Sequence, residues 1–418
     1  MSFLKKILKF ILRLLAQRVL IKYQPDIIGI TGSVGKTSTK EAIFCVLKNS
    51  FKVRKNEKNY NNELGVPLTI INGEAKGKSV FGWLSVFFNA LKIIFFKNRD
   101  YPQILILEMG ADHPGDIKYL TSLAPCKIGV LTAIGPTHLE YFGSVAEVKK
   151  EKKIIVTHLS ADKQAILNRD DEQVWSVRND VRASIISYGL HEDSLLKASD
   201  IILSQSREGI SFKMSYKGSV VPVILPNFLA KVQVYNVLAA AAVGVVYDLN
   251  LLEIAESLKE LMPAKGRMRL LNGIKETKII DDTYNSSPKA AAAALKTIAE
   301  MLCEGDKIAV LGDMLELGEV TEEEHFKLGS LVVESKINYL VTVGHRSRAI
   351  AQGALEAGLS ADRIINFANA DEARIPVQNK IKKGDLILVK GSRGMHLEKI
   401  VKEIMLEPLR ASELLVGY

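Results

Sequence analysis

Cysteine is scarce in this chain of 418 residues. Its three cysteines, Cys45, Cys126 and Cys303, lie far apart. Their separation excludes both the close spacing of a zinc site and the paired spacing of a disulfide framework. The chain also shows no internal repeat and no low-complexity tract. These absences favour a globular protein of the reducing cytoplasm.

Acidic residues are missing from the first 25 positions. Six basic residues precede Asp26, and they supply most of the net charge of +9. Charges interrupt the apolar run and no small-residue cleavage site follows it, so neither a spanning helix nor a signal peptide is supported. The apolar residues recur at helical spacing: Leu4, Ile7, Leu8, Ile11, Leu14 and Leu15. We expect an amphipathic helix over 1–25, which either lies on an anionic membrane or packs on the protein's own body.

Aromatic residues make up only 7% of the chain, yet residues 80–96 are rich in them. This apolar block is too long for a strand. It forms either a core helix or, together with residues 1–24, a hydrophobic patch that touches a membrane surface. The second interpretation adds a peripheral position on the inner face of the membrane to the cytoplasmic location. Basic residues that alternate with Leu, Ile and Phe favour lipid over nucleic acid, so we expect no nucleic-acid partner.

One glycine-bearing turn organises the first half of the chain. The apolar run 27–30 leads into Thr31-Gly-Ser-Val-Gly-Lys-Thr-Ser38, and a helix-compatible stretch follows to Leu47. A strand, turn and helix in this order predict a phosphate-binding loop rather than a glycine turn beside a surface lysine. We expect Lys36 to reach the β- and γ-phosphates of ATP and Thr37 to bind Mg²⁺. The residues expected to contact the nucleotide here are Thr31, Gly32, Ser33, Gly35, Lys36, Thr37 and Ser38.

Two further apolar strands end in polar residues. The run 104–107 ends at Glu108, and the run 128–132 leads into Gly135-Pro-Thr-His138. The carboxyl ends of parallel strands meet at the edge of a sheet where open α/β proteins bind ligands. We therefore expect Glu108 and His138 to join Lys36 and Thr37 in one site, with Glu108 holding Mg²⁺.

The pattern of strands and helices restarts in the second half. Apolar strands are expected at 278–280, 308–311, 339–343 and 386–389, alternating with helices, and a helix is expected over 144–159. The predicted fold class is α/β: a central ATP-binding domain at 26–269 with a mainly parallel sheet, and a smaller Rossmann-like domain at 270–418. We expect the polar stretch 263–269 to be the hinge between the two domains.

The ordered motifs of this chain resemble those of the Mur ligases, and most closely the type that adds D-alanyl-D-alanine to a muramoyl tripeptide. The resemblance runs from about residue 26 to 407. Besides the phosphate-binding loop and Gly135–His138, it is carried by these stretches: Asn61-Asn-Glu-Leu-Gly-Val-Pro67, Leu107-Glu-Met-Gly-Ala111, Leu167-Asn-Arg-Asp-Asp171, Tyr235-Asn-Val-Leu-Ala-Ala240, Gly266-Arg-Met268, Asp281-Asp-Thr-Tyr-Asn-Ser-Ser-Pro288, Leu311-Gly-Asp-Met-Leu-Glu-Leu-Gly318 and Val389-Lys-Gly-Ser-Arg393.

This resemblance implies an ATP-dependent ligase that forms an amide bond in cell-wall peptide synthesis. The carboxylate of an acceptor attacks the γ-phosphate to give an acyl phosphate, and the amine of an amino acid or dipeptide then attacks the activated carbonyl. By resemblance, Asn236 faces adenine, Arg267 approaches the phosphates, and Asp282, rather than Asp281, meets the ribose. Glu108 and His138 hold a metal. Phosphoryl transfer depends on positioning and charge neutralisation, which the Lys36 and Mg²⁺ pair supplies.

The family also uses a carbamylated lysine as a metal ligand, and the spacing from His138 selects Lys152 over its neighbours. Carbamylation needs a neutral amine, so we expect burial or nearby cations to lower the pKa of Lys152. Lys36, His138 and Lys152 are then the catalytic residues. The residues expected to face the substrates are Asn61, Asn62, Asp313, Glu316, Lys390, Ser392 and Arg393.

The chain departs from the family pattern in places. Only about 25 residues precede the first strand, so we expect the usual UDP-sugar-binding domain to be absent. Ala133 replaces a customary asparagine, Ala230-Lys-Val-Gln233 replaces the customary glycine and histidine, and Ser286-Ser287 replaces Ala-Asn. Two alternatives to the cell-wall ligase therefore stay open: a related ligase with a lipid-linked or polyglutamyl acceptor, and a membrane-associated ATP-binding scaffold.

Overall fold

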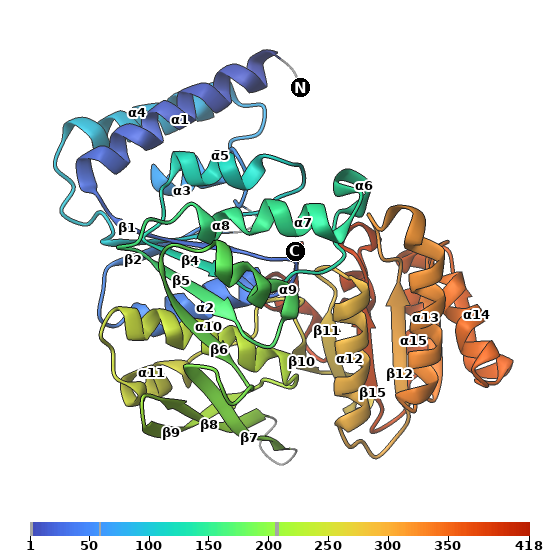
Figure 1. The fold of residues 1–418 in the computed structure, drawn as a ribbon. Coiled ribbons are helices and arrows are strands. Elements are labelled where there is room, and N and C mark those ends of the chain that lie inside the picture. The colour runs from blue at the N-terminus through green and yellow to red at the C-terminus, as the bar shows by residue number, and fades with distance from the viewer. Residues whose placement is uncertain (1–2, 58–59, 205–208) are drawn as a thin grey trace.

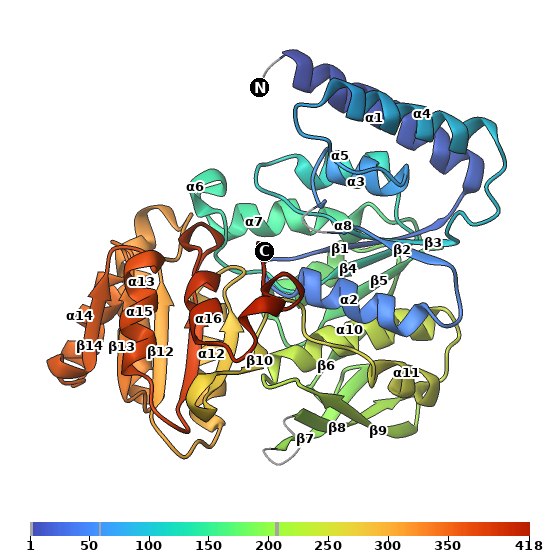
Figure 2. The same ribbon diagram turned by 180° about the vertical axis from the view of Figure 1, so that it is seen from behind.

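The computed structural model describes residues 3–57, 60–204 and 209–418, and the side chains of residues 3–5 and 204 lie outside the description. The predicted apolar position Leu4 therefore has no described side chain. Two sheets organise the chain (Figures 1 and 2). The larger sheet has nine strands in the order β2-β3-β1-β4-β5-β6-β7-β8-β9. Its strands are β1 Asp26–Thr31, β2 Val53–Lys55, β3 Ile104–Glu108, β4 Ile128–Leu131, β5 Gln164–Asn168, β6 Ser184–Gly189, β7 Leu196–Ser204, β8 Gly209–Tyr216 and β9 Ser219–Pro226.

The strands from β2 to β7 run parallel, and β8 and β9 continue the sheet as an antiparallel meander. The parallel strands are apolar on both faces because helices cover both (Figure 1). One face carries α2 Lys36–Leu47, α10 Val232–Val246 and α11 Leu251–Leu258. The other carries α3 Gly65–Ile70, α5 Asp116–Leu123, α7 Val145–Lys152 and α8 Ile154–Thr157. The short helices α6 Leu139–Phe142 and α9 Glu172–Trp175 follow β4 and β5.

The smaller sheet has six strands in the order β10-β11-β15-β12-β13-β14. All of its neighbours are parallel except β10, which pairs antiparallel with β11. The strands are β10 Arg269–Asn272, β11 Lys278–Asp282, β12 Lys307–Gly312, β13 Tyr339–Val343, β14 Ile364–Phe367 and β15 Leu386–Lys390. The helices are α12 Pro288–Glu300, α13 Thr321–Glu334, α14 Arg348–Glu356, α15 Ala370–Lys380, α16 Glu398–Ile404 and α17 Ala411–Leu414. The predicted α/β class and the second sheet are confirmed.

The two apolar segments of the N-terminal half form an outer layer. Helix α1 (Phe3–Tyr23) lies beside α4 (Val80–Phe95), over α3 and α5 (Figures 1 and 2). Leu12, Ala16 and Val19 of α1 are fully buried, so this helix packs on the protein's own body, one of the two predicted outcomes. Residues 80–96 join α1 rather than a core, since only Val86 and Ala90 of α4 are buried. In the described part of the chain, no helix has both the length and the apolarity to cross a membrane.

Three local predictions need correction. The helix expected over 144–159 is divided into α7 and α8, with Lys153 at the junction. Strands β10 and β14 were not predicted. Both are short and lie at the edges of the smaller sheet, where a strand needs only one pairing partner and little apolar sequence. The domain boundary at 269/270 stays a prediction.

Candidate active site

The glycine loop between β1 and α2 shapes the first part of the site. Gly35 forms the N-cap of α2 with φ of 91°, a left-handed conformation that residues with a Cβ adopt only with strain. Its Cα also faces Asn236 so closely that a Cβ would lie 2.6 Å from the amide oxygen. Lys36 Nζ donates a hydrogen bond to the carbonyl of Gly32 at 2.6 Å, and burial lowers the pKa of this amine. Ser33 Oγ ties the loop to the carbonyl of Gly135 at 3.0 Å. The loop thus presents its backbone N–H groups at a helix N-terminus, which suits phosphate.

Glu108 stands beside this loop and is held from several directions. Thr37 Oγ1 donates to its Oε2 at 2.9 Å, and Asn61 Nδ2 donates to its Oε1 at 3.1 Å. The side chain of Asn56 donates to the Glu108 carbonyl at 3.0 Å and accepts from its N–H at 2.9 Å. Buried Lys40 lies 3.9 Å from the carboxylate. The carboxylate is therefore fixed in orientation before any ligand arrives.

The Thr37 hydroxyl and the Glu108 carboxylate are suitable ligands for Mg²⁺. Both offer oxygen, the donor that this ion prefers, and Mg²⁺ in phosphate sites usually takes one or two carboxylates together with substrate oxygens. Among residues 3–57, 60–204 and 209–418, no group of three His, Cys, Asp or Glu side chains forms a fuller cluster. An ion held here would depend on phosphate oxygens for the rest of its coordination shell.

His138 lies where the two halves of the molecule meet. It caps α6 in a left-handed conformation, with φ of 53°. Its Nδ1 is 2.6 Å from Glu316 Oε2, and its Nε2 is 3.6 Å from Asp112 Oδ1. The N–H of Leu139 donates to the Glu316 carbonyl at 3.1 Å, which fixes the loop after β12 against α6. Burial lowers the pKa of His138, although the two carboxylates oppose this shift.

Lys152 is buried at the end of α7. Burial, reinforced by the positive charge of Lys36, lowers the pKa of Lys152 to about 7, against the attraction of Asp112 and Glu151. Glu151 is itself engaged, because its carboxylate accepts from the N–H groups of Gly115 and Ile117. A large fraction of Lys152 is therefore neutral near pH 7, the state that reaction with CO₂ requires.

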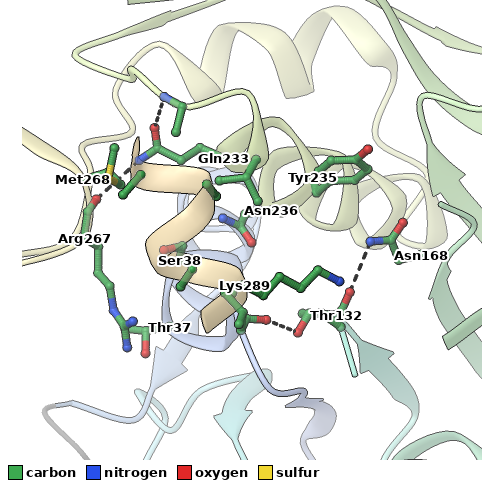
Figure 3. Close-up of a pocket in the computed structure, with 18 of the residues that line it drawn as sticks. Thr37, Ser38, Thr132, Asn168, Gln233, Tyr235, Asn236, Arg267, Met268 and Lys289 are labelled. Carbon is green, nitrogen blue, oxygen red and sulfur yellow. Dashed lines mark hydrogen bonds between the residues drawn. The ribbon is translucent and has the colours of Figure 1, made fainter. Parts of the chain in front are cut away.

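A cavity of about 280 Å³ opens beside the loop, between the two sheets (Figure 3). We call it the first cavity. The predicted nucleotide-binding residues that line it are Gly35, Thr37, Ser38, Asn236, Arg267 and Asp282. Apolar atoms make up most of its wall, and a few polar groups project into it, as in small-molecule sites generally.

Gln233 connects three segments at the rim of the first cavity. Its Oε1 accepts from the N–H groups of Leu229 and Ala230 at 3.1 and 3.0 Å, and its Nε2 donates to the Arg267 carbonyl at 3.4 Å (Figure 3). Its side chain therefore fixes the entry to α10 against the segment that leads into the smaller sheet.

A second cavity of about 260 Å³ shares Val34, Gly35 and Arg267 with the first. The Arg267 guanidinium stacks on the ring of Tyr284, 4.0 Å from its centroid. The second cavity extends from the glycine loop to the smaller sheet. Its predicted site residues are Ser33, Gly35, Lys36, His138, Arg267, Glu316, Ser392 and Arg393.

Some residues predicted to contact the substrates or the nucleotide have other partners in the structure. Asp313 lines neither cavity; its carboxylate is buried and accepts from the Ser347 N–H at 2.8 Å. Asn62 accepts from the N–H of Gly65 at 3.0 Å and so caps the start of α3. Lys390 is buried and forms an ion pair with Asp282 at 2.7 Å. Thr31, at the end of β1, donates to the Met109 carbonyl at 2.7 Å. Of these four residues, only Lys390 lines one of the two cavities.

Sequence reasoning missed four polar residues around the site. Asn56 and Lys40 hold Glu108, and neither belongs to a motif that assigns them this role. Lys289 at the start of α12 forms an ion pair with Asp171 at 3.0 Å, which joins the smaller sheet to the end of β5. Asp171 was quoted within a motif without a role. Only the fold brings these residues to the site, so spacing in the sequence could not have found them.

A glycine loop before a helix, an acidic residue at the end of the next strand, and cavities enclosed between two α/β sheets define a nucleotide-binding enzyme that acts between domains. Residues 30–81 and 89–244 match the family model described as the Mur ligase middle domain, and residues 266–393 match the one described as the Mur ligase, glutamate ligase domain. The chain belongs to the Mur ligase family and is an ATP-dependent ligase.

Individual relatives support this assignment. The chain is 32% identical over 398 residues to the UDP-N-acetylmuramoyl-tripeptide–D-alanyl-D-alanine ligase of Bacillus subtilis, covering 95% of this chain and 80% of the relative. Its fold is similar to that of MurF from Acinetobacter baumannii, with a TM-score of 0.79, 26% identity and coverage of 94% and 79% of the two chains. MurF ligase from Thermotoga maritima, solved in complex with ADP, gives a TM-score of 0.77 at 26% identity, with coverage of 94% and 83%.

Proposed function

We propose that this protein joins D-alanyl-D-alanine to the free carboxylate of a UDP-N-acetylmuramoyl tripeptide and consumes ATP in doing so. The observation that carries the proposal is the 32% identity over 95% of the chain to a ligase named for this reaction. The glycine loop, the Thr37–Glu108 pair and the two joined cavities supply a site for a nucleotide and an acceptor side by side.

The first cavity takes the nucleoside of ATP in this proposal. Asn236 lies directly behind Gly35 and offers amide groups to adenine, and Asp282 at the end of β11 offers a carboxylate to the ribose. The glycine loop then leads the phosphates toward the second cavity, where Arg267 can reach them because it lines both. Supporting this path, a guanidinium stacked on an aromatic ring is oriented in advance and loses little freedom on binding phosphate.

Lys36 has the central role at the transferred phosphate. Its amine now bonds to the Gly32 carbonyl, within the loop that would hold the phosphates. Exchange of this single contact for phosphate oxygens would place a positive charge where negative charge passes from ATP to the acceptor. Thr37 and Glu108 would hold Mg²⁺, which neutralises phosphate charge when bound.

His138 and Lys152 belong to the acceptor side. We propose that Lys152 is carbamylated, which would turn a buried amine into an anion able to share in holding a metal. The lowered pKa of Lys152 supports the proposal, since CO₂ adds only to the neutral amine. His138, whose ring contacts Glu316, lines the second cavity. Asn61, Ser392 and Arg393 remain proposed substrate contacts.

The proposal is tested by following ADP release from the purified chain. With UDP-N-acetylmuramoyl tripeptide and D-alanyl-D-alanine together, we expect ADP and a pentapeptide product of matching mass in equal amounts. Omission of either substrate should reduce ADP to background. ADP formation that ignores both substrates would contradict the ligase assignment. Product formation only with another acceptor, such as a lipid-linked or polyglutamyl one, would contradict the proposed substrate and leave the ligase chemistry intact.

A further inference from the structure

The outer layer of the molecule carries an unusual apolar surface. Eleven of the exposed large hydrophobic residues belong to α1 and to residues 80–96, and every exposed phenylalanine of the described residues is among them. We call this surface the helical plate. Its exposed apolar residues are Ile7, Phe10, Leu14, Ile21, Val80, Phe81, Leu84, Phe88, Leu91, Phe95 and Phe96.

The plate follows the geometry of its helices. On α4, Phe81, Leu84, Phe88, Leu91 and Phe95 recur at three- and four-residue steps, so they form one stripe along the outward face. Phe81 is 85% exposed and Phe95 76% exposed. The inward face of α4, with Val86 and Ala90, is apolar as well. Exposed Ser85, Asn89 and Lys92 form a polar strip along one side of α4. The rest of the helix is apolar on both its inward and its outward face, although it lies on the outside of the fold (Figures 1 and 2).

On α1 the outward face repeats this arrangement. Ile7, Phe10, Leu14 and Ile21 are exposed at helical spacing, while Leu12, Ala16 and Val19 are buried against the protein. An exposed apolar surface of this extent, formed by two adjacent helices, marks a surface that another body covers.

The plate is held as a rigid unit. Lys22 Nζ donates to the carbonyls of Ile93, Ile94 and Phe96, at 2.9, 2.9 and 2.6 Å, and so satisfies the end of α4 with a charge from the end of α1. Tyr23 Oη donates to the Ile93 carbonyl at 2.9 Å. The two stripes therefore keep a fixed relation to each other and to the active-site domain.

The charge around the plate identifies its occupant. Residues 1–24 and 75–99 contain eleven of the 56 basic residues of the chain and none of its 47 acidic ones. The rest of the chain consequently has two more acidic residues than basic ones. Exposed cations include Lys6 and Arg18 on α1 and Lys97 and Arg99 just beyond α4. The acidic residues that flank this segment, Glu74 and Asp100, pair with Lys76 and Lys52. An apolar stripe on helices that carry only positive charge matches a bilayer with anionic headgroups, where acyl chains accept the phenylalanines and phosphates accept the lysines and arginines.

We propose that the helical plate docks this enzyme on an anionic membrane surface, with the phenylalanines of α4 at the level of the acyl boundary. Docking leaves the active site accessible, because the plate is separated from the glycine loop by the layer of α3 and α5 (Figure 1). The α6 segment that follows His138 lies on the plate side of the large sheet (Figures 1 and 2).

The test uses the full chain with point substitutions, since removal of residues 1–24 would also uncover buried partners of Leu12 and Val19. Phe81→Glu/Phe88→Glu places two anions within the stripe. Leu302→Glu/Leu409→Glu is the matched control, because these side chains are 78% and 98% exposed in the second half of the chain. Flotation is measured with vesicles of phosphatidylcholine alone and with one third phosphatidylglycerol.

We expect the unmodified chain and the control variant to float with the anionic vesicles, and the Phe81→Glu/Phe88→Glu variant to bind them at least tenfold more weakly. Binding of the unmodified chain should fall at least tenfold on phosphatidylcholine alone. Melting temperature and soluble-substrate ADP release should be unchanged in both variants, which separates failure of docking from failure of the proposed ligase function.

Absence of vesicle binding by the unmodified chain, or equal binding by the stripe variant, would overturn the proposal. Light scattering tests whether a second copy of this chain covers the plate instead. If the unmodified chain is a dimer that does not bind vesicles, and Phe81→Glu/Phe88→Glu converts it to a monomer, the plate is a dimer interface.

Discussion

Helices α10 and α4 have similar lengths and similarly apolar sequences, yet they differ in what covers them. Ten of the 15 residues of α10 are buried, whereas two of the 16 residues of α4 are. The small buried side chains Ala239 to Ala242 let α10 pack closely against its neighbours, while α4 turns its large side chains outward. An apolar sequence thus predicts that a helix will be covered. Whether the protein's own core or another surface covers it depends on the size of its side chains and on the neighbouring helices.

We expect residues on the α2/α10 face to act in catalysis and residues of the α1/α4 layer to act in docking. Loss of Lys36 tests this division most directly. Lys36→Ala removes the cation at the start of α2. We expect ADP release to fall at least a hundredfold, about 2.7 kcal/mol of transition-state stabilisation or more, with an unchanged melting temperature. Phe81→Glu/Phe88→Glu should stay within twofold of the unmodified enzyme on soluble substrates. A comparable loss in both variants would remove the distinction between the two layers.

Substitutions in α10 and α4 should also differ in their effect on the free energy of unfolding. Ala240→Leu inserts methylene groups into the packed α10 interior, where overpacking costs about 1–3 kcal/mol of unfolding free energy. Leu84→Ala removes a comparable volume from α4, where the side chain is 55% exposed, and should change the unfolding free energy by less than about 0.5 kcal/mol. Urea denaturation of the two variants measures both values. Equal losses would mean that α4 packs as tightly as α10.

The pH dependence of stability should report the ionisation of Lys152, the buried amine on the α1/α4 side of the large sheet. Burial lowers the pKa of Lys152 from 10.5 to about 7, so between these values the unfolded chain binds a proton that the folded chain does not. The folded state is therefore penalised most below pH 7, and its stability relative to a Lys152→Met variant should rise by about 1.4 kcal/mol per unit between pH 7.5 and 9. Denaturation in bicarbonate-free buffer measures this difference.

Lys150→Met provides the control, because the side chain of Lys150 is 72% exposed on the same helix. Its stability should follow that of the unmodified chain at every pH. A Lys152→Met difference that does not change with pH would show that the amine keeps its ordinary pKa when folded.

The smallest effect is expected at the contact between the two sheets. Lys289→Met breaks the ion pair with Asp171 beside the first cavity, and because Lys289 is 59% exposed, the pair contributes at most about 1 kcal/mol. We expect the KM for ATP to rise up to fivefold with little change in kcat. Lys231→Met breaks a comparable pair with Glu300 that does not border the cavity and should leave KM unchanged. Equal effects would point to a general loosening between the sheets.

The local parts of the site were predictable from sequence. The glycine loop, β1 and α2 are contiguous, so their residue types and spacing specify them without help from the rest of the fold. Glu108 and His138 could be placed at the same edge because parallel strands deliver their ends together. The outward orientation of α4 was left open, since an apolar helix has the same sequence whether a core or another surface covers it.

Contacts between distant segments could not be predicted. Asn56 holds both backbone groups of Glu108 across 52 residues, and Glu316 reaches His138 from the other sheet. Such pairs depend on how the two sheets are set against each other. Asp313 shows the converse. Its place in a motif suggested a contact with substrate, whereas in the structure its carboxylate accepts a hydrogen bond from the Ser347 N–H.

The bond from Lys22 to the end of α4 spans 71 residues of chain, which has a consequence during synthesis. At 5–20 residues per second, a ribosome needs roughly 4–14 s to make the partner after α1 has been made. For that time the carbonyls that Lys22 binds do not yet exist, although α3, which also packs on α1, precedes α4 in the chain. Completion of the α1/α4 layer therefore waits for residues 93–96, whereas the contacts of α1 with α3 involve residues that are made earlier.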